Sequence, residues 1–194
     1  MKDATVEAAD AILRRHGIGY VIVGGKAVAQ EAATATVDVD VMVTTTDYRG
    51  AVQRLGSDPG LTLAWEANQV TRFGIVAHDG IPLDVVDSGA FSGKRSGQEF
   101  FDFLVREASS EVDGVRYASP EAVWYTRLLT KRWRAYAEKI LTNVIDGLPA
   151  DRLRGVELIA RRFGTEATVR VRIAYVREEL ARSALASQTG PSEH

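Results

Sequence analysis

Cysteine is absent from all 194 residues, so disulfide bonds and thiolate metal sites are excluded. Histidine is scarce: His16, His78 and His194 lie far apart, and such spacing does not predict a zinc site. No hydrophobic run approaches the roughly 18 residues that a membrane-spanning helix needs. Residues 1–7 carry acids where a signal peptide would be basic and then apolar, so we expect a cytoplasmic protein without a membrane partner.

A strong charge of one sign is also missing. The net charge of −2 gives no overall case for nucleic-acid binding, and 45% hydrophobic residues are ordinary for a soluble domain. Charge is nevertheless uneven, because residues 131–182 contain 12 Lys or Arg against 7 Asp or Glu, a balance of +5. Two interpretations stay open: solvated helix faces, or a basic wall that would suit a polyanionic substrate.

The first part of the chain alternates between helical and extended patterns. Helices are predicted over 3–16, 26–33, 47–55 and 98–107, and strands over 20–23, 36–43, 61–65, 70–77 and 81–86. A hairpin is predicted at Asp113-Gly114, and Ser119-Pro120 begins a helical stretch to about residue 186, with breaks near 147–149 and 164–165. We therefore expect an α+β fold, with a core at 1–118, a helical part at 119–186 and a flexible tail at 187–194.

Two carboxylates stand inside one predicted strand. Asp38 and Asp40 are spaced i, i+2, which places them on the same face, where two like charges are costly. A divalent cation such as Mg²⁺ would compensate them. Asp84 lies inside a later strand and is the leading third ligand, whereas Asp87 lies just past that strand and is better explained as a strand-end or capping residue. Alternatively, Asp38 and Asp40 line the solvent face of an edge strand, and Asp84 is an exposed polar residue.

A glycine pair follows the first predicted strand. Gly24 and Gly25 would present backbone N–H groups to an anion, and Lys26 could contact a triphosphate. The spacing is neither a Walker A motif nor a Rossmann fingerprint. An ordinary turn remains the alternative for the two glycines taken alone.

The combination of these motifs resembles the nucleotidyltransferase superfamily of the DNA polymerase β type. The matching residues are Val23-Gly24-Gly25, Asp38-Val39-Asp40-Val41 and Asp84. The resemblance implies a mixed β-sheet core with flanking helices. It also implies that the three acids are catalytic and hold two Mg²⁺ ions, that the third acid activates an acceptor hydroxyl, and that the glycines and the neighbouring helix grip the phosphates of a nucleoside triphosphate (NTP).

The stretch from Tyr117 to Trp124, followed by Arg127 and Lys131, resembles the post-sheet helix of the AbiEii branch, which includes toxins of the MenT group. This resemblance implies a toxin of a toxin–antitoxin system that acts on tRNA and has a cognate antitoxin. Thr34 stands where that branch often has an arginine. Lys131, Arg134 and Lys139 are candidate phosphate or acceptor contacts, and Arg72 is a weaker one.

Three functions remain open on the sequence. The acceptor of the nucleotide is either tRNA or a small hydroxylated molecule such as an aminoglycoside-like antibiotic. A third possibility is a nucleotide-binding module that has lost catalysis, although the presence of all three acids argues against it. The aromatic residues Trp124, Tyr125, Trp133 and Tyr136 fall on helical spacing and are expected to pack rather than to stack on bases.

Overall fold

The computed structural model describes residues 3–28, 38–66, 72–77, 80–135 and 150–188. It divides into two compact units, residues 1–123 and 124–194. The first unit combines a mixed sheet with helices and the second is helical, which confirms the predicted α+β class. The predicted boundary at residue 118 and the tail at 187–194 stay predictions.

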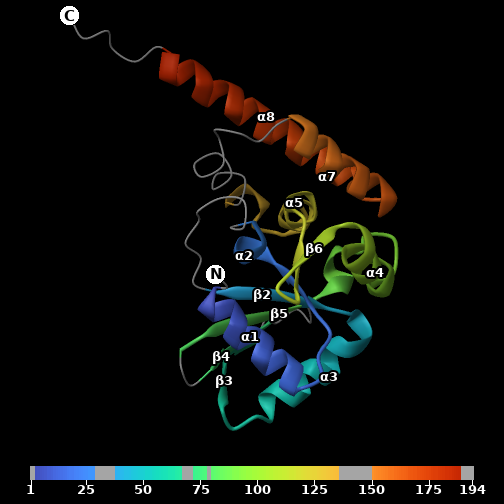
Figure 1. Ribbon diagram of the computed structural model, residues 1–194. Helices are drawn as coiled ribbons and strands as arrows, with labels where there is room; N and C mark the ends of the chain where they lie inside the picture. Colours follow the sequence, from blue (N-terminus) through green and yellow to red (C-terminus); the bar gives the residue numbers. More distant parts are fainter. Residues whose placement is uncertain (1–2, 29–37, 67–71, 78–79, 136–149, 189–194) are drawn as a thin grey trace, which may run out of the picture. The chain divides into compact units, whose positions relative to one another are not determined.

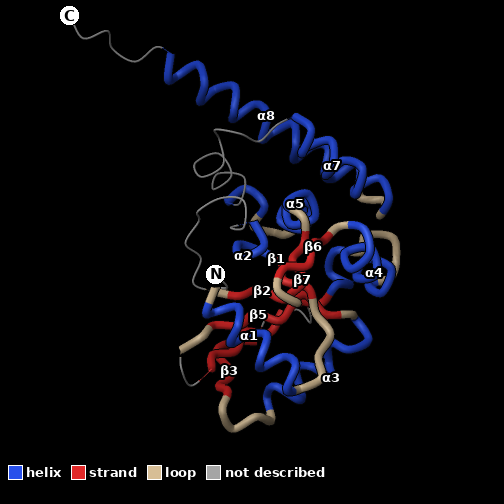
Figure 2. Tube along the Cα trace, in the orientation of Figure 1, coloured by secondary structure: helices blue, strands red, loops and turns tan. Residues whose placement is uncertain are grey.

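A seven-stranded sheet forms the centre of the first unit. Its order is β3-β4-β5-β2-β1-β7-β6, and the strands appear in red in Figure 2. β2 runs parallel to β5 and β1 runs parallel to β7, whereas the other neighbours are antiparallel. The strands are β1 (Val21–Val23), β2 (Val39–Val43), β3 (Leu61–Glu66), β4 (Arg72–Ala77), β5 (Pro82–Asp87), β6 (Ser109–Val112) and β7 (Val115–Ala118).

The period-two pattern of β2 sorts its side chains between the two faces of the sheet. Val39, Val41 and Val43 are fully buried on one face, and Asp40 points to the other. Figure 1 shows α1 (Ala4–Arg15) and α3 (Thr45–Gly56) together on one side of β2 and β5, with α2 (Gly24–Val28) on the opposite side. Both faces of the sheet are thus packed: Met42 and Val86, on the same face as Asp40, are also buried, and the acidic side chains stand at one end of that face.

Local capping sets where these helices begin. Asp3 accepts from the backbone N–H groups of Thr5 and Val6 at the start of α1, and Thr44 accepts from that of Asp47 at the start of α3. The helix predicted over 26–33 begins two residues earlier, because the backbone turns into the helix at Gly24, and its residues 29–33 lie outside the described residues. Residues 36 and 37 of the predicted strand also lie outside them, and the strand begins at Val39, so Asp38 lies just before the strand and not inside it as predicted.

A short 3₁₀ helix, η1 (Ser88–Phe91), and α4 (Gly97–Glu107) follow β5. Ser96 and Glu99 form a capping box at the start of α4. Further along, Asp113 (φ 52°) and Gly114 (φ 79°) make the tight turn of the predicted hairpin, with both residues in the left-handed region.

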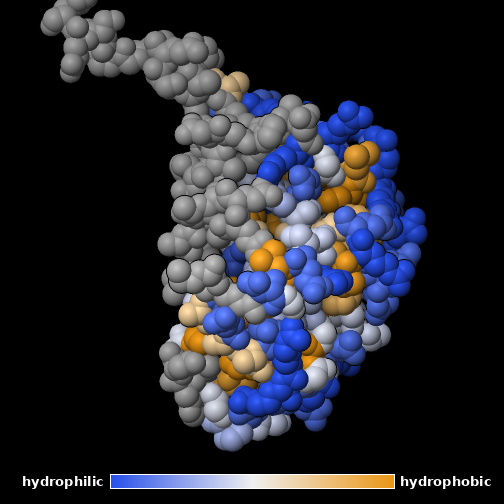
Figure 3. All heavy atoms as spheres, in the orientation of Figure 1, coloured by the Kyte–Doolittle hydropathy of each residue, from blue (hydrophilic) through white to orange (hydrophobic). Residues whose placement is uncertain are grey.

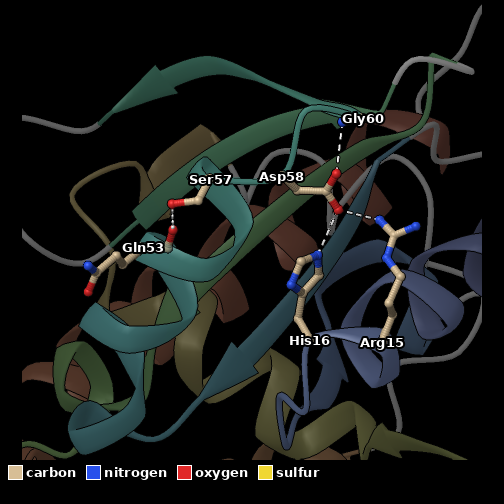
Figure 4. Close-up of polar contacts among 6 residues, drawn as sticks. All are labelled: Arg15, His16, Gln53, Ser57, Asp58 and Gly60. Atoms are coloured by element: carbon tan, nitrogen blue, oxygen red, sulfur yellow. Dashed lines mark hydrogen bonds and ion pairs between the residues drawn. The ribbon is translucent and has the colours of Figure 1, made fainter.

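The end of α1 is fastened to the turn before β3 (Figure 4). One carboxylate oxygen of Asp58 accepts from His16 Nε2 at 2.7 Å and from the Arg15 guanidinium, and the other accepts from the Gly60 N–H at 2.8 Å. His16 is also the C-cap residue of α1, in keeping with its predicted place at a helix end. The hydrogen bonds from Gly60 and His16 lower the pKa of Asp58.

The second unit begins within α5 (Pro120–Leu129) and continues with α7 (Ala150–Arg162) and α8 (Glu166–Gln188). α7 and α8 pack against one another, and Gly164 (φ 67°) forms the predicted break between them. Their buried residues are Leu153, Val156, Ile159, Ala160, Phe163, Val169, Ile173 and Val176. The predicted break at 147–149 lies outside the described residues.

The helical stretch predicted from Pro120 has a break that was not predicted: α5 ends at Leu129, and residues 133–135 are helical again. The Arg172 guanidinium donates to the carbonyl of Leu128 and, at 3.4 Å, to that of Thr130. The Thr130 hydroxyl donates to the Arg127 carbonyl at 2.9 Å. These contacts satisfy carbonyls that the last turn of a helix leaves without intrahelical partners, so the end of α5 is set partly by α8.

Hydrophilic residues occupy most of the coloured surface on the face drawn in Figure 3, with small hydrophobic areas between them. Among the described residues, no helix combines the length and the hydrophobicity that crossing a bilayer requires.

Candidate active site

The candidate site is a row of register partners across neighbouring strands. Asp40 on β2 pairs with Asp84 on the parallel strand β5, and it pairs with Val23 on β1 on its other side. Gly74 on β4 is the next partner of Asp84. Because direct register partners share a face, the two carboxylates stand side by side between an apolar residue and a glycine.

The three predicted acids converge. Asp38, Asp40 and Asp84 each offer a carboxylate oxygen, and these oxygens lie within 4.8 Å of one another. Asp84 is buried, with 7% of its surface exposed, while Asp38 and Asp40 are partly exposed. Three like charges at this spacing repel each other, and partial burial strengthens the repulsion by removing water.

Hard divalent cations fit this set of donors. Mg²⁺ binds oxygen at about 2.0–2.1 Å, so ligands on opposite sides of one ion stand about 4 Å apart. Two ions about 3.5–4 Å apart, as in two-metal phosphoryl-transfer sites, also match a cluster of this width. The described residues therefore have the carboxylates that such a site needs, with one partly exposed side where water and substrate oxygens could complete the coordination.

Asp87 takes no part in this cluster. It is three residues beyond Asp84 along β5, so its side chain lies on the opposite face of the sheet. Its carboxylate accepts from the Thr45 hydroxyl and from the Gly89 N–H, each at 2.7 Å, and caps η1. The interpretation of Asp87 as a strand-end and capping residue is therefore confirmed.

The residues predicted to bind the nucleotide lie at the start of α2. Gly24 and Gly25 are the first two residues of that helix. Lys26 Nζ is 2.6 Å from Asp3 Oδ2 and the Lys26 side chain is 10% exposed. The hydrogen bond from Lys26 lowers the pKa of Asp3. In this structure Lys26 thus fastens α2 to the N-terminal end of α1, and its contact with a triphosphate stays a prediction.

The basic candidates of the second unit differ in their surroundings. Lys131 and Arg134 are exposed, and the Arg134 guanidinium lies over the rings of Trp133 at 5.4 Å and Tyr175 at 5.9 Å. Lys139 lies outside the described residues. Arg72 pairs with Val86, two residues beyond Asp84 along β5.

Most of the aromatic residues are used in packing, as expected. Trp124 and Tyr125 are buried, and Trp133 meets Tyr175 edge to face at 5.3 Å. Burial raises the pKa of Tyr125 to about 12, and its hydroxyl accepts from Thr165 at 3.2 Å. Tyr136 lies outside the described residues.

Several arginines of residues 131–182 form ion pairs within α7 and α8. Arg161 and Arg170 pair with Glu166, and Arg177 pairs with Glu157. Arg182 pairs with the two glutamates before it. These contacts favour solvated, ion-paired helix faces for this part of the chain over a continuous basic wall.

Sequence reasoning did not single out Gly74, the partner of Asp84 on the side away from Asp40. It brings no side chain beside the buried carboxylate. A glycine inside a strand pattern often marks a close approach of another group, and that local signal was present. The sequence around Gly74 does not show which residue of β5 is its partner.

No protein-family model matches the sequence, and no curated protein matches it significantly. Solved structures that are similar to it include the following three. ANT(2″)-Ia, in complex with adenylyl-2″-tobramycin, is 18% identical with a TM-score of 0.42, covering 90% of this chain and 95% of its own. A Helicobacter pylori protein provisionally described as a nucleotidyltransferase is 10% identical with a TM-score of 0.42, covering 92% and 95%. JHP933 from Helicobacter pylori is 9% identical with a TM-score of 0.38, covering 97% and 98%. These similarities are weak, so the chemistry of this chain must be inferred from its own residues.

Proposed function

We propose that this protein is a Mg²⁺-dependent nucleotidyltransferase that transfers a nucleoside monophosphate from an NTP to an acceptor hydroxyl and releases pyrophosphate. The observation that carries the proposal is the convergence of Asp38, Asp40 and Asp84, with oxygens within 4.8 Å of one another. Asp40 and Asp84 lie on neighbouring strands and Asp38 lies just before β2, and three carboxylate oxygens this close together are the donors that a hard divalent cation prefers.

The acceptor oxygen forms a bond to the α-phosphorus as the bond from that phosphorus to pyrophosphate breaks. Bound Mg²⁺ would supply positive charge against the triphosphate and the leaving group. Asp38 and Asp40 would hold the ions, and Asp84 would share one of them and assist removal of the proton from the acceptor hydroxyl.

Gly24, Gly25 and Lys26 hold the phosphates in this proposal. Lys26 would exchange its partner Asp3 for a phosphate oxygen, or bind both. Replacing Lys26 with alanine should raise the KM for the NTP more than it lowers kcat, whereas Asp3→Asn should leave the KM near that of the wild type. Equal KM values for the wild type and Lys26→Ala would show that Lys26 does not bind the NTP.

The reaction can be tested directly with an α-³²P-labelled NTP, Mg²⁺, and a panel of acceptors that contains mixed tRNA and aminoglycosides. Wild type should transfer label to one acceptor class, and Asp40→Asn should reduce the rate by at least about 100-fold, because it removes charge that the metal needs. Asp102→Asn is the matched control, since Asp102 lies on α4 and accepts from Gln98 instead. Transfer at equal rates by wild type and Asp40→Asn would refute the proposal.

The acceptor is tRNA in the first version of the proposal, in which the protein is a toxin with a cognate antitoxin. In the second version it is a small hydroxylated molecule such as an aminoglycoside-like antibiotic. Expression in a bacterial host separates the two, because the first predicts growth arrest and the second predicts drug resistance. Either phenotype should disappear with Asp38→Ala. NTP binding without turnover across the panel would instead favour a catalytically silent module.

A further inference from the structure

Gly24 lies directly beside the carboxylate of Asp40. A Cβ built on Gly24 would stand 2.0 Å from Asp40 Oδ2, 2.8 Å from its Cγ and 3.0 Å from its Cβ. Carbon atoms do not approach carboxylate oxygens this closely. No residue other than glycine therefore fits at this position while the Asp40 side chain keeps its conformation.

The sheet register explains why the two residues meet. Val23, the last residue of β1, pairs with Asp40 on β2, and Gly24 is the next residue along the chain. The backbone turns out of the sheet at Gly24 with φ of 67°, so it passes beside the Asp40 carboxylate instead of continuing along the strand.

We infer that Gly24 is a positioning residue for Asp40: the missing side chain at Gly24 leaves the space in which the Asp40 carboxylate is held toward Asp38 and Asp84. The inference rests on the proposed metal site, and it gives Gly24 a role beyond contact with phosphates. A side chain at position 24 would turn the Asp40 carboxylate away from the other two acids, and metal binding would weaken even without a nucleotide.

The left-handed backbone at Gly24 would favour glycine even without Asp40 nearby. The effect of backbone strain must therefore be separated from the effect of the steric conflict with Asp40. Gly17 provides the comparison. Its φ is 61°, close to that of Gly24, but a Cβ at Gly17 would have nothing within 4 Å. Gly17→Ala therefore carries the same backbone strain without the steric conflict.

The first measurement is the affinity of the protein for Mn²⁺ without nucleotide. The electron paramagnetic resonance signal of the free ion reports how much Mn²⁺ is unbound. Gly24→Ala should weaken Mn²⁺ binding about tenfold or more, which is the effect typical of residues that orient metal ligands. Gly17→Ala should bind as the wild type does. A Gly24→Ala protein that binds Mn²⁺ with wild-type affinity would overturn the inference.

The second measurement is a thermal-stability cycle on metal-free protein. Gly24→Ala should lower Tm more than Gly17→Ala does, and most of this extra loss should disappear when Asp40→Ala is also present, because the carboxylate atoms at 2.0 and 2.8 Å are then gone and only the Cβ contact at 3.0 Å remains. An extra loss that is equally large in the Asp40→Ala background would show that the Asp40 carboxylate is not the group in conflict, and would overturn the inference.

The two measurements keep this inference separate from the proposed function. If wild type binds no Mn²⁺, the proposed metal site fails, and the stability cycle alone decides whether Gly24 makes room for Asp40. If Gly24→Ala does not fold, recovery of folding in Gly24→Ala/Asp40→Ala supports the inference. Failure of both to fold, while Gly17→Ala and Asp40→Ala fold, contradicts it.

Discussion

Asp40 and Asp84 are direct register partners on the parallel strands β2 and β5, although 44 positions separate them in the chain. Their carboxylates, together with that of Asp38, bring three oxygens within 4.8 Å. At the other end of this strand pair, Thr44 follows the last residue of β2 and Asp87 is the last residue of β5, and these two residues cap the starts of α3 and η1. One strand pair thus carries the candidate chemistry at one end and structural caps at the other.

Replacing Asp84 with asparagine should abolish the response of the protein to metal. Asparagine keeps the shape of the side chain but removes one of the three clustered carboxylates that a divalent cation needs. Thermal unfolding in EDTA and in excess Mg²⁺ measures the effect: Mg²⁺ should raise the Tm of the wild type and leave that of Asp84→Asn unchanged. An equal rise in Tm for both proteins would show that Asp84 does not bind the metal.

Asp87→Ala should lower the stability of the protein and leave its metal binding unchanged. It removes the acceptor of the Thr45 hydroxyl and of the Gly89 N–H in a buried position, so a loss of about 1–3 kcal/mol is expected. Mn²⁺ affinity should stay at the wild-type value, because Asp87 lies on the other face of the sheet. If Asp87→Ala is fully folded and still binds Mn²⁺ more weakly than the wild type, Asp87 belongs to the metal site.

Gly97→Ala should destabilise the joint between α3, η1 and α4. A Cβ there would stand 1.8 Å from the Thr45 hydroxyl oxygen and 2.8 Å from the backbone nitrogen of Gly89, so overpacking by about 1–3 kcal/mol is expected. Gly56→Ala, at the end of α3 with open space around it, should be neutral or stabilising by up to about 1 kcal/mol. Chemical denaturation of the two variants provides the comparison.

Arg172→Ala should destabilise the helical unit by about 1–3 kcal/mol. It would leave the carbonyls of Leu128 and Thr130 without their donor and remove a guanidinium that lies 5.2 Å from the Trp133 ring centre. Arg170→Ala, on the same helix, breaks only an exposed pair with Glu166 and should cost no more than about 0.5 kcal/mol. Equal losses in the two variants, measured by urea unfolding, would contradict the capping role of Arg172.

Asp58 should make stability depend on pH in the acid range. Its pKa in the folded protein is below the ordinary value of 3.8, mainly through the hydrogen bonds from Gly60 and His16. The contribution of Asp58 is therefore fully present above pH 3.8 and is lost as the pH falls through the lowered pKa. Asp58→Asn should be less stable than wild type at pH 7, and the difference in Tm should narrow below pH 4. If the difference in Tm between wild type and Asp58→Asn stays constant down to pH 2, the lowered pKa of Asp58 does not contribute to stability.

Much of the fold follows from patterns within a few residues of each other. The alternation around Asp38 and Asp40 predicted a strand with both acids on one face, and Ser119-Pro120 predicted a helix start. These signals are local, because strand alternation and helix capping depend on neighbours two to four positions away. The local pattern also separated Asp84, inside a strand, from Asp87 at its end.

Tertiary structure decided the partners. The sequence predicted that Asp84 would join Asp40 at a metal site, but not that the two would be direct register partners. It also did not show that Asp3 would pair with Lys26, or that Arg172 would contact the end of α5. Gly24 was interpreted from its own surroundings as a phosphate-binding residue, and only the register of β1 on β2 reveals the Asp40 carboxylate in the space beside it. Strand register depends on the packing of residues far apart in the chain, so local patterns identify which side chains share a face, and the folded sheet determines which of them meet.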